Sequence, residues 1–216
     1  MIDLSIVLQA GGQSSRMGCD KGLVPFQRKP LLQFILDQIA DLGKETIIIS
    51  NQPAEYQQFG LPIFGDVYPD VGALGGLYSA IHHATQPYCL VLACDMPFVN
   101  RSFLEHLIML AASHDAVIPR LSPPGKVGKV FAEPFRAVYN KSCLQPIQTA
   151  IDNGQRRVIS FFDDVDIRFV ERHEIEQFDP QVRSFFNINT PADLAEAERL
   201  AREMGKLGTD QTDDPG

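Results

Sequence analysis

The sequence predicts an α/β fold in which helices cover both faces of a mostly parallel sheet. Short apolar runs rich in β-branched residues alternate with segments of helical spacing from residue 5 to residue 119. Continuous apolar runs are typical of strands buried on both faces, and strands that alternate with helices are typical of βαβ units. We therefore expect a single domain of three layers.

The predicted elements follow one another in a regular order. Strands are expected over residues 5–10, 46–50, 62–65, 88–94 and 116–119, and again over 133–139 after a Pro/Gly/Lys loop at 121–129. Helices are expected from residue 30 to residue 43, over 74–84 and over 102–112. In the first helix, Pro30 stands at the start, apolar residues recur every three or four positions, and Gly43 follows the end.

A last helix is expected to begin at Thr190. Threonine is a common cap, Pro191 suits the first helical position, and Asp193 places an acid at the third. Its expected apolar face comprises Leu194, Ala197, Ala201 and Met204. Residues from Gly205 onward show no periodicity, so we expect the domain to span 1–204 and residues 205–216 to form a disordered tail.

Composition restricts the class of protein. Of the 216 residues, 44% are hydrophobic, which is enough for a sizeable core, and the net charge of −8 attracts neither nucleic acid nor an anionic membrane. No apolar run approaches the roughly 20 residues that span a bilayer. The four cysteines form no C-x-x-C pair. We expect a cytoplasmic protein with reduced thiols and no zinc site.

The most informative segment is the loop after the first strand, LQAGGQSSRMGCDK at residues 8–21. Gly11 and Gly12 allow backbone amides to approach a phosphate chain without hindrance from a Cβ atom, while Arg16 and Lys21 supply positive charge. The loop contains neither G-x-x-x-x-G-K-[ST] nor G-x-G-x-x-G. Spacing alone predicts an anion site and leaves open a polar connection with incidental basic residues.

This loop resembles the L-x-G-G-x-S-x-R-M-G-x-D-K motif of the molybdenum cofactor guanylyltransferases, which belong to the pyrophosphorylase-like nucleotidyltransferases. Four further segments match that family in order: GALGGL at 72–77, CDMPF at 94–98, QRRV at 155–158 and NINTP at 187–191. The resemblance extends from residue 4 to about residue 204 and implies a nucleotide-diphospho-sugar transferase-like (Rossmann-like) fold. Gln9 replaces the family's usual leucine, and Ala73 replaces its usual proline.

The resemblance also implies where the nucleotide binds. Lys21 would hold its phosphates, and the residues that would line or contact the rest of the nucleotide are Gln9, Ala10, Gly11, Gly12, Asn51 and Asp66. Asn51 and Asp66 follow the second and third predicted strands, so they lie at the carboxyl edge of the sheet, where such sheets bind ligands.

Asp95 ends the strongest predicted strand and matches the family's magnesium ligand. Mg²⁺ takes oxygen ligands and is commonly held by one or two carboxylates together with substrate phosphates. Attack on a triphosphate develops negative charge on phosphate oxygens, so cations are needed rather than a protein nucleophile. Arg16, Lys21 and Asp95 are therefore the candidate catalytic residues. The alternative is that Asp95 only caps the turn before Met96.

The acceptor is expected to meet the C-terminal half of the chain. Asn187 and Asn189, two apart on an extended segment, are expected to point the same way and either contact the acceptor's phosphate or help to bind the metal. The alternative is that both only satisfy backbone groups at a helix entry. Arg156 and Arg157 are weaker candidates, since surface arginines at a helix start are common.

The reaction that the resemblance implies is transfer of GMP from MgGTP to the terminal phosphate of molybdenum-bound molybdopterin, with release of pyrophosphate. The nearest rival is a cytidylyltransferase acting on the same cofactor, which would favour A-A-G over Ala10-Gly11-Gly12. A sugar-phosphate nucleotidyltransferase is a more distant rival, and a non-catalytic nucleotide-binding partner protein is the rival of another class. Cofactor-insertion proteins or the receiving molybdoenzyme are the partners that the family suggests.

Overall fold

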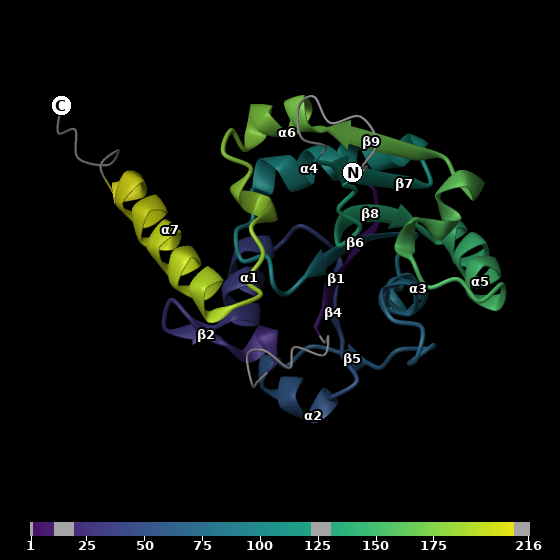
Figure 1. Ribbon diagram of the computed structural model, residues 1–216, viewed down its shortest axis with the longest axis horizontal. Helices are drawn as coiled ribbons and strands as arrows, with labels where there is room; N and C mark the ends of the chain where they lie inside the picture. Colours follow the sequence, from purple (N-terminus) through teal and green to yellow (C-terminus); the bar gives the residue numbers. More distant parts are fainter. Residues whose placement is uncertain (1, 11–19, 122–130, 210–216) are drawn as a thin grey trace.

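A seven-stranded sheet forms the centre of the computed structural model, which describes residues 2–10, 20–121 and 131–209 (Figure 1). Its strands lie in the order β5-β4-β1-β6-β8-β7-β9. The strands are β1 (Leu4–Gln9), β4 (Glu45–Ile49), β5 (Ile63–Phe64), β6 (Tyr88–Ala93), β7 (Ala116–Arg120), β8 (Arg136–Asn140) and β9 (Ile167–Glu171). A small hairpin pairs β2 (Pro25–Phe26) with β3 (Lys29–Pro30).

The sheet is mostly parallel, as the sequence predicts. Within the seven described strands of this sheet, β8 runs antiparallel to its neighbours β6 and β7, and the other pairs are parallel. Gln9 pairs with Ile49 on one side and with Ala93 on the other, so three central strands end level. The residues that follow these strands therefore meet at one carboxyl edge.

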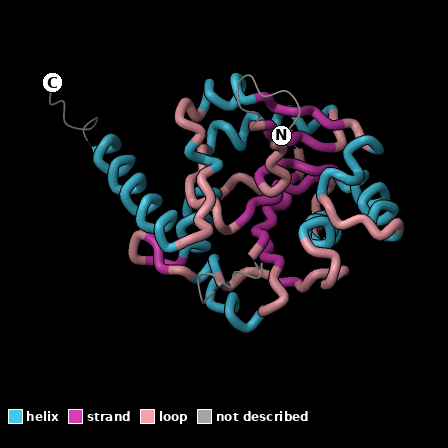
Figure 2. The backbone as a smooth tube through the Cα atoms, in the orientation of Figure 1, coloured by secondary structure: helices cyan, strands magenta, loops and turns pink. Residues whose placement is uncertain are grey.

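Helices cover both faces of the sheet. The α-helices are α1 (Leu31–Ile39), α2 (Pro53–Tyr56), α3 (Ala73–His83), α4 (Arg101–Leu110), α5 (Leu144–Asp152), α6 (Arg172–Phe178) and α7 (Pro191–Thr209). Short 3-10 helices are η1 (Lys21–Leu23), η2 (Gln57–Phe59), η3 (Ala111–Ser113), η4 (Lys141–Cys143), η5 (Val158–Asp164) and η6 (Arg183–Phe185). Figure 2 shows α1, α4 and α6 on one side of the strands and α3 and α5 on the other.

Two apolar clusters fill the spaces between these layers. Alternate residues of a strand point to opposite faces, and on β6 Leu90 joins the cluster under α1, α4 and α6 while Val91 joins the cluster under α3 and α5. A third, smaller cluster around Phe26, Phe98 and Ile188 connects the hairpin and α1 to α7. The three predicted layers are confirmed.

Some predicted boundaries are wrong. The first helix ends at Ile39 rather than near Gly43, because Ala40 leaves the helical conformation and Asp41 adopts a positive φ of 65°. Leu42 is buried although it lies outside the helix. At the other end of the chain, α7 continues beyond Met204 to Thr209, since glycine within a helix costs only about 1 kcal/mol relative to alanine. Residues 210–216 lie outside the described residues.

No helix in the described part of the chain is both long and apolar enough to cross a membrane.

Candidate active site

An ion pair joins the start and the middle of the chain at the carboxyl edge of the sheet. Lys21 Nζ lies 3.0 Å from Asp95 Oδ2 and donates a second hydrogen bond of 2.6 Å to Asn189 Oδ1. The Lys21 and Asp95 side chains are 20% and 23% exposed, so a ligand can reach both. A cation between a carboxylate and an amide oxygen is suited to contact a polyphosphate.

Local packing fixes the position of Lys21. Asp20 caps the short helix η1 by accepting a hydrogen bond of 3.1 Å from Gly22 N. Gly22 lies against the buried ring of Tyr56 on α2, where a Cβ atom would come within 2.9 Å of the Tyr56 hydroxyl oxygen. Burial raises the pKa of Tyr56, so this hydroxyl stays protonated at neutral pH. Glycine at position 22 thus allows η1 to lie directly on α2.

Backbone hydrogen bonds hold Asp95 and Asn189 side by side. Asp95 O accepts a hydrogen bond of 2.8 Å from Ile188 N, which brings the segment before α7 against the end of β6. Asp193 Oδ2 accepts hydrogen bonds from the backbone nitrogens of Asn189, at 3.0 Å, and Thr190, at 2.8 Å. The bond from Asn189 N is the largest of the causes that lower the pKa of Asp193. The predicted cap of α7 therefore also positions Asn189.

A cleft of about 700 Å³ lies at the same edge of the sheet. Its volume falls within the range of small-molecule and cofactor sites. Its lining comes mainly from the ends of β1, β4 and β5 and from the start of α3, and includes Gln9, Ala10, Asp20, Ser50, Asn51, Asp66, Gly72, Gly76 and Phe135.

Polar atoms in this cleft are available for a ligand. Asn51 Nδ2 donates to Asp66 Oδ2 at 2.8 Å, and Asn51 Oδ1 accepts from Asp66 N at 2.8 Å, so the two side chains hold each other. Gln9 Oε1 and Asp66 Oδ1 are buried and have no hydrogen-bond partner among the described residues. Buried acceptors of this kind are costly unless a partner satisfies them, and a bound molecule with N–H or O–H donors would supply one.

Residues 6–167 match the family model described as the MobA-like NTP transferase domain. The chain belongs to this family. It is a nucleotidyltransferase, and the match covers the strands whose carboxyl ends carry the cleft and Asp95.

Relatives of this MobA-like domain carry consistent names. A Clostridium perfringens protein named "Probable molybdenum cofactor guanylyltransferase" is 34% identical over 193 residues, covering 88% of this chain and 93% of the relative. A Methanosarcina mazei protein of the same name is 33% identical over 213 residues, covering 92% of each chain.

Solved structures show the same fold. Molybdopterin-guanine dinucleotide biosynthesis protein A from Archaeoglobus fulgidus is 27% identical, with a TM-score of 0.77 over 92% of this chain and 99% of that one. A 2-C-methyl-D-erythritol 4-phosphate cytidylyltransferase from Thermus thermophilus, at 19% identity, has a TM-score of 0.68 over 93% of this chain and 100% of that one, and shows the fold alone. The MobA-like domain thus has the expected nucleotide-diphospho-sugar transferase-like fold.

The predicted site residues fall into three groups. Lys21, Asp95 and Asn189 are in contact, and Gln9, Ala10, Asn51 and Asp66 line the cleft. Gly11, Gly12 and Arg16 lie outside the described residues.

The candidate acceptor residues are not all in one place. Asn187 Nδ2 donates to Phe185 O at 3.5 Å, so Asn187 does not share the environment of Asn189. Arg156 and Arg157 are exposed between α5 and η5, and neither belongs to the described residues that line the cleft or contact Lys21.

Sequence reasoning missed several residues of this MobA-like domain. Asp20 and Phe135 line the cleft, and Tyr56 supports η1. Gly76 was part of a matched motif but had no assigned role: a Cβ atom there would lie 2.7 Å from Gln9 Nε2. The usable signal was the glycine pair at the start of a predicted helix, which indicates close packing.

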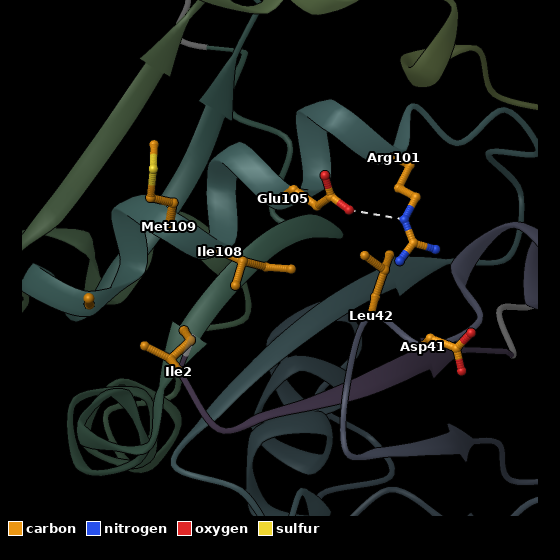
Figure 3. A pocket seen from close by; sticks show the side chains of 8 residues that line it. Ile2, Asp41, Leu42, Arg101, Glu105, Ile108 and Met109 are labelled. Carbon is orange, nitrogen blue, oxygen red and sulfur yellow. Dashed lines mark hydrogen bonds and ion pairs between the residues drawn. The ribbon is translucent and has the colours of Figure 1, made fainter.

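A second hollow, of about 520 Å³, lies elsewhere on the MobA-like domain (Figure 3). Ile2, Leu42, Ile108 and Met109 contribute apolar surface to it, beside the Arg101–Glu105 ion pair. Ile2 precedes β1 and Leu42 precedes β4, so this hollow is at the amino edge of the sheet, away from Asp95. The cation in its lining, Arg101, is paired with Glu105, and Asp41 adds a second carboxylate, so the hollow is not suited to bind a triphosphate.

Proposed function

We propose that this chain transfers GMP from GTP to the terminal phosphate of molybdenum-molybdopterin, releasing pyrophosphate and forming molybdopterin guanine dinucleotide. The observation that carries the proposal is the Lys21–Asp95–Asn189 contact, which lies at the same sheet edge as a nucleotide-sized cleft. The names of the relatives support the choice of cofactor and base.

The proposed reaction forms one bond and breaks one. An ionised oxygen of the acceptor's terminal phosphate attacks the α-phosphorus of GTP, and the bond from that phosphorus to the oxygen of the β-phosphate breaks. Negative charge grows on the departing pyrophosphate, so a nearby ammonium group such as that of Lys21 stabilises the transition state. An attacking phosphate needs no general base, because its oxygen is already ionised at neutral pH.

Asp95 fits the role of magnesium ligand. Its carboxylate is partly exposed where β6 ends, and Asn189 places an amide oxygen close by. Oxygen donors of this kind suit Mg²⁺, which would bind Asp95 together with phosphate oxygens and offset their charge. Lys21 holds the carboxylate in place, and Arg16 is proposed to bind phosphate from the glycine loop.

Base choice is proposed to depend on the acceptor atoms in the cleft. Gln9 Oε1 and Asp66 Oδ1 are buried without hydrogen-bond partners in the part of the chain that the structure describes, and guanine offers adjacent N1–H and 2-amino donors. A buried hydrogen-bond acceptor that is left unpaired discriminates against a base that lacks the matching donor.

The remaining candidate residues have separate proposed roles. Gly11 and Gly12 are proposed to contact the nucleotide through their backbone. Asn187, Arg156 and Arg157 are proposed to contact the molybdenum-molybdopterin acceptor or its surroundings. We propose a cytoplasmic location, with cofactor-insertion proteins or the receiving molybdoenzyme as partners.

The direct test measures pyrophosphate released by purified protein with molybdenum-molybdopterin and Mg²⁺, with GTP, CTP, ATP and UTP offered separately. We expect release with GTP, and a loss of at least about 100-fold in Asp95→Asn, which removes the charge but keeps the shape. Asp3→Asn, which changes an exposed carboxylate paired with Lys44 at the opposite edge of the sheet, is the matched control and should lose much less. Release with CTP alone would indicate a cytidylyltransferase, and no release with any nucleotide would contradict the proposal.

A further inference from the structure

A buried guanidinium lies directly behind the loop that carries Asp95. Arg136, the first residue of β8, is 1% exposed. Its Nη1 donates to Phe98 O at 3.0 Å, and its Nη2 donates to Met96 O at 2.9 Å. Its Nε is buried and has no hydrogen-bond partner within residues 2–10, 20–121 and 131–209. The guanidinium carbon lies 5.9 Å from the ring centre of Phe185.

The two carbonyls that Arg136 holds belong to residues one and three positions after Asp95. Met96 and Phe98 are both buried, so these carbonyl oxygens depend on protein donors. On its other side, the loop is fixed by the hydrogen bond from Ile188 N to Asp95 O. Arg136 from β8 and the segment that bears Asn189 thus both form hydrogen bonds to the turn at residues 95–98, from opposite sides.

The planar fork of an arginine suits this arrangement. Two donors fixed in one plane can hold two carbonyl oxygens at a set separation, which the single ammonium group of lysine cannot do. Phe98 also packs in the cluster with Phe26 and Ile188, so the turn is attached to the hairpin that follows Lys21. The position of the Asp95 carboxylate relative to Lys21 therefore depends on this turn.

The charge on Arg136 is costly to maintain. Burial lowers its pKa to about 10, and the carboxylates of Glu133, Asp179 and Asp95 oppose that effect. The side chain is therefore still protonated at neutral pH. An apolar side chain of similar size in a buried position is often as stable as a buried charge or more so, so a role in stability alone does not explain an arginine here.

We propose that Arg136 is a positioning residue, which fixes the Asp95 turn so that the carboxylate can bind the metal ion of a metal–nucleotide complex. This inference rests on the proposed function. Arg136 acts through the Met96 and Phe98 carbonyls and is not proposed to contact nucleotide or acceptor. Its removal should therefore weaken metal binding far more than it weakens nucleotide binding without metal.

The test compares Arg136→Met and Arg136→Lys with the wild-type protein. Two quantities are measured: binding of Mn²⁺ in the presence of GTP, by electron paramagnetic resonance and without acceptor, and the Mg²⁺ concentration that gives half-maximal pyrophosphate release. In Arg136→Met we expect both the apparent Mn²⁺ dissociation constant and the half-saturating Mg²⁺ concentration to rise about tenfold, or more. GTP binding without metal should change less than about twofold. Arg136→Lys, which keeps the charge but offers a single donor nitrogen, should give values between those of Arg136→Met and the wild type.

Val138→Ala is the matched control, because Val138 lies two residues along the same strand and is buried in the cluster that β8 shares with β6. It should lower stability and leave metal binding unchanged, which separates positioning from loss of stability. Wild-type metal binding in a folded Arg136→Met would overturn the inference. If Arg136→Met does not fold, the same measurements on Arg136→Lys test the inference, and metal binding equal to that of the wild type in this variant would overturn it. A wild-type protein that binds Mn²⁺ and GTP but releases no pyrophosphate would contradict the proposed function instead.

Discussion

At the scale of single residues, Lys21 carries the clearest chemical role. Its ammonium group contacts a charged oxygen of Asp95 and a neutral oxygen of Asn189. When a polyphosphate binds, the lysine can exchange part of these contacts for phosphate oxygens without leaving the site. Lysine suits such a movable charge, since its head group is compact and its stem flexible.

Lys21→Ala should therefore lower turnover more than nucleotide affinity. We expect kcat to fall by about 100-fold to 1,000-fold, as expected for a group that stabilises developing charge, with a change below about tenfold in the dissociation constant for GTP. Steady-state kinetics and equilibrium titration with a fluorescent GTP analogue measure the two quantities. Lys29→Ala, which removes an exposed lysine paired with Asp37, is the control. Equal losses of turnover and affinity in Lys21→Ala would disprove a role specific to the transition state.

The sequence indicated most of these residues because each follows a predicted strand or lies in a matched motif. Asp95, Asn51 and Asp66 come directly after buried strands, which end at one edge of the sheet. Asn187 and Asn189 were expected to point the same way, but they have different contacts. The backbone nitrogen of Asn189 donates to Asp193, whereas the side chain of Asn187 donates to the carbonyl of Phe185. The sequence did not indicate that Arg136 is buried, because a charged residue in a strand usually lies on an exposed face.

At the scale of elements, the start of α3 shows how two adjacent glycines can differ. A Cβ atom on Gly75 would lie 2.6 Å from the backbone oxygen of Tyr68 and 2.9 Å from Val71 Cβ. A Cβ atom on Gly76 would instead meet the end of the Gln9 side chain. The first clash requires backbone to move, whereas the second can be relieved by a flexible side chain that lines the cleft.

Gly75→Ala should lower the free energy of unfolding by about 1–3 kcal/mol, the usual cost of overpacking. Gly76→Ala should leave stability near that of the wild type, because alanine is favoured over glycine in helices, but weaken GTP binding by about tenfold as Gln9 is displaced. Urea unfolding and GTP titration of both variants separate the two effects. Wild-type affinity in Gly76→Ala would show that the position of Gln9 does not matter for the nucleotide.

Asp115 joins three elements at the opposite edge of the sheet. Its Oδ1 accepts from the Ser142 hydroxyl at 2.5 Å, and its Oδ2 accepts from Asp166 N at 3.0 Å, which links β7 to η4 and to the start of β9. The hydrogen bond from Ser142, followed by that from Asp166, lowers the pKa of Asp115 below its ordinary value of 3.8. The ionised carboxylate therefore stabilises the fold above pH 3.8, and this stabilisation is lost as pH falls through the lower, folded-state pKa.

Asp115→Asn should lower the free energy of unfolding by about 1 kcal/mol at pH 7, the typical net value of a hydrogen bond. The difference from the wild type should shrink toward pH 3, because below pH 3.8 the carboxyl of the unfolded wild-type chain takes up a proton, which favours unfolding, whereas the amide does not titrate. Urea unfolding at both pH values measures it. A difference that is equal at pH 7 and pH 3 would contradict the assigned pKa direction.

The strongly patterned elements could be predicted from sequence, and the weakly patterned ones could not. The runs of β1, β4 and β6 are largely apolar, and that of β4 is also rich in β-branched residues, so a buried strand is the structure that fits each of them. Between residues 140 and 190 the chain instead forms short helices, several of them 3-10, and β9, a strand with four half-buried residues out of five. Such elements have little periodicity, because packing rather than local propensity stabilises them: α5, η4 and η5 pack against α3, and α6 and β9 pack against β7.

At the scale of the whole molecule, one sheet supports both apolar clusters and the site. Leu90 and Val91 are neighbours on β6 and belong to opposite clusters. The cleft and the Lys21–Asp95 pair both depend on strands that end level at one edge. We propose that the residues from the N-terminus through α7 form a single cooperative domain.

Leu90→Ala and Val91→Ala should therefore shift the same unfolding transition. We expect losses of about 2–5 kcal/mol for Leu90→Ala, the usual range for a buried leucine, and about 2 kcal/mol for Val91→Ala. Tryptophan is absent from the chain, so tyrosine fluorescence and circular dichroism are the two probes. Transitions that separate in either variant would indicate two independently folding units.

In the proposed reaction, the α-phosphorus of GTP is attacked and GMP is transferred. The measurement that tests it most directly follows label from [α-³²P]GTP and, in parallel, from [γ-³²P]GTP after incubation with the protein, Mg²⁺ and molybdenum-molybdopterin. We predict that α-label appears in the dinucleotide product and γ-label only in pyrophosphate. Transfer of γ-label to the acceptor, or release of γ-label as inorganic phosphate with no labelled product, would contradict the account.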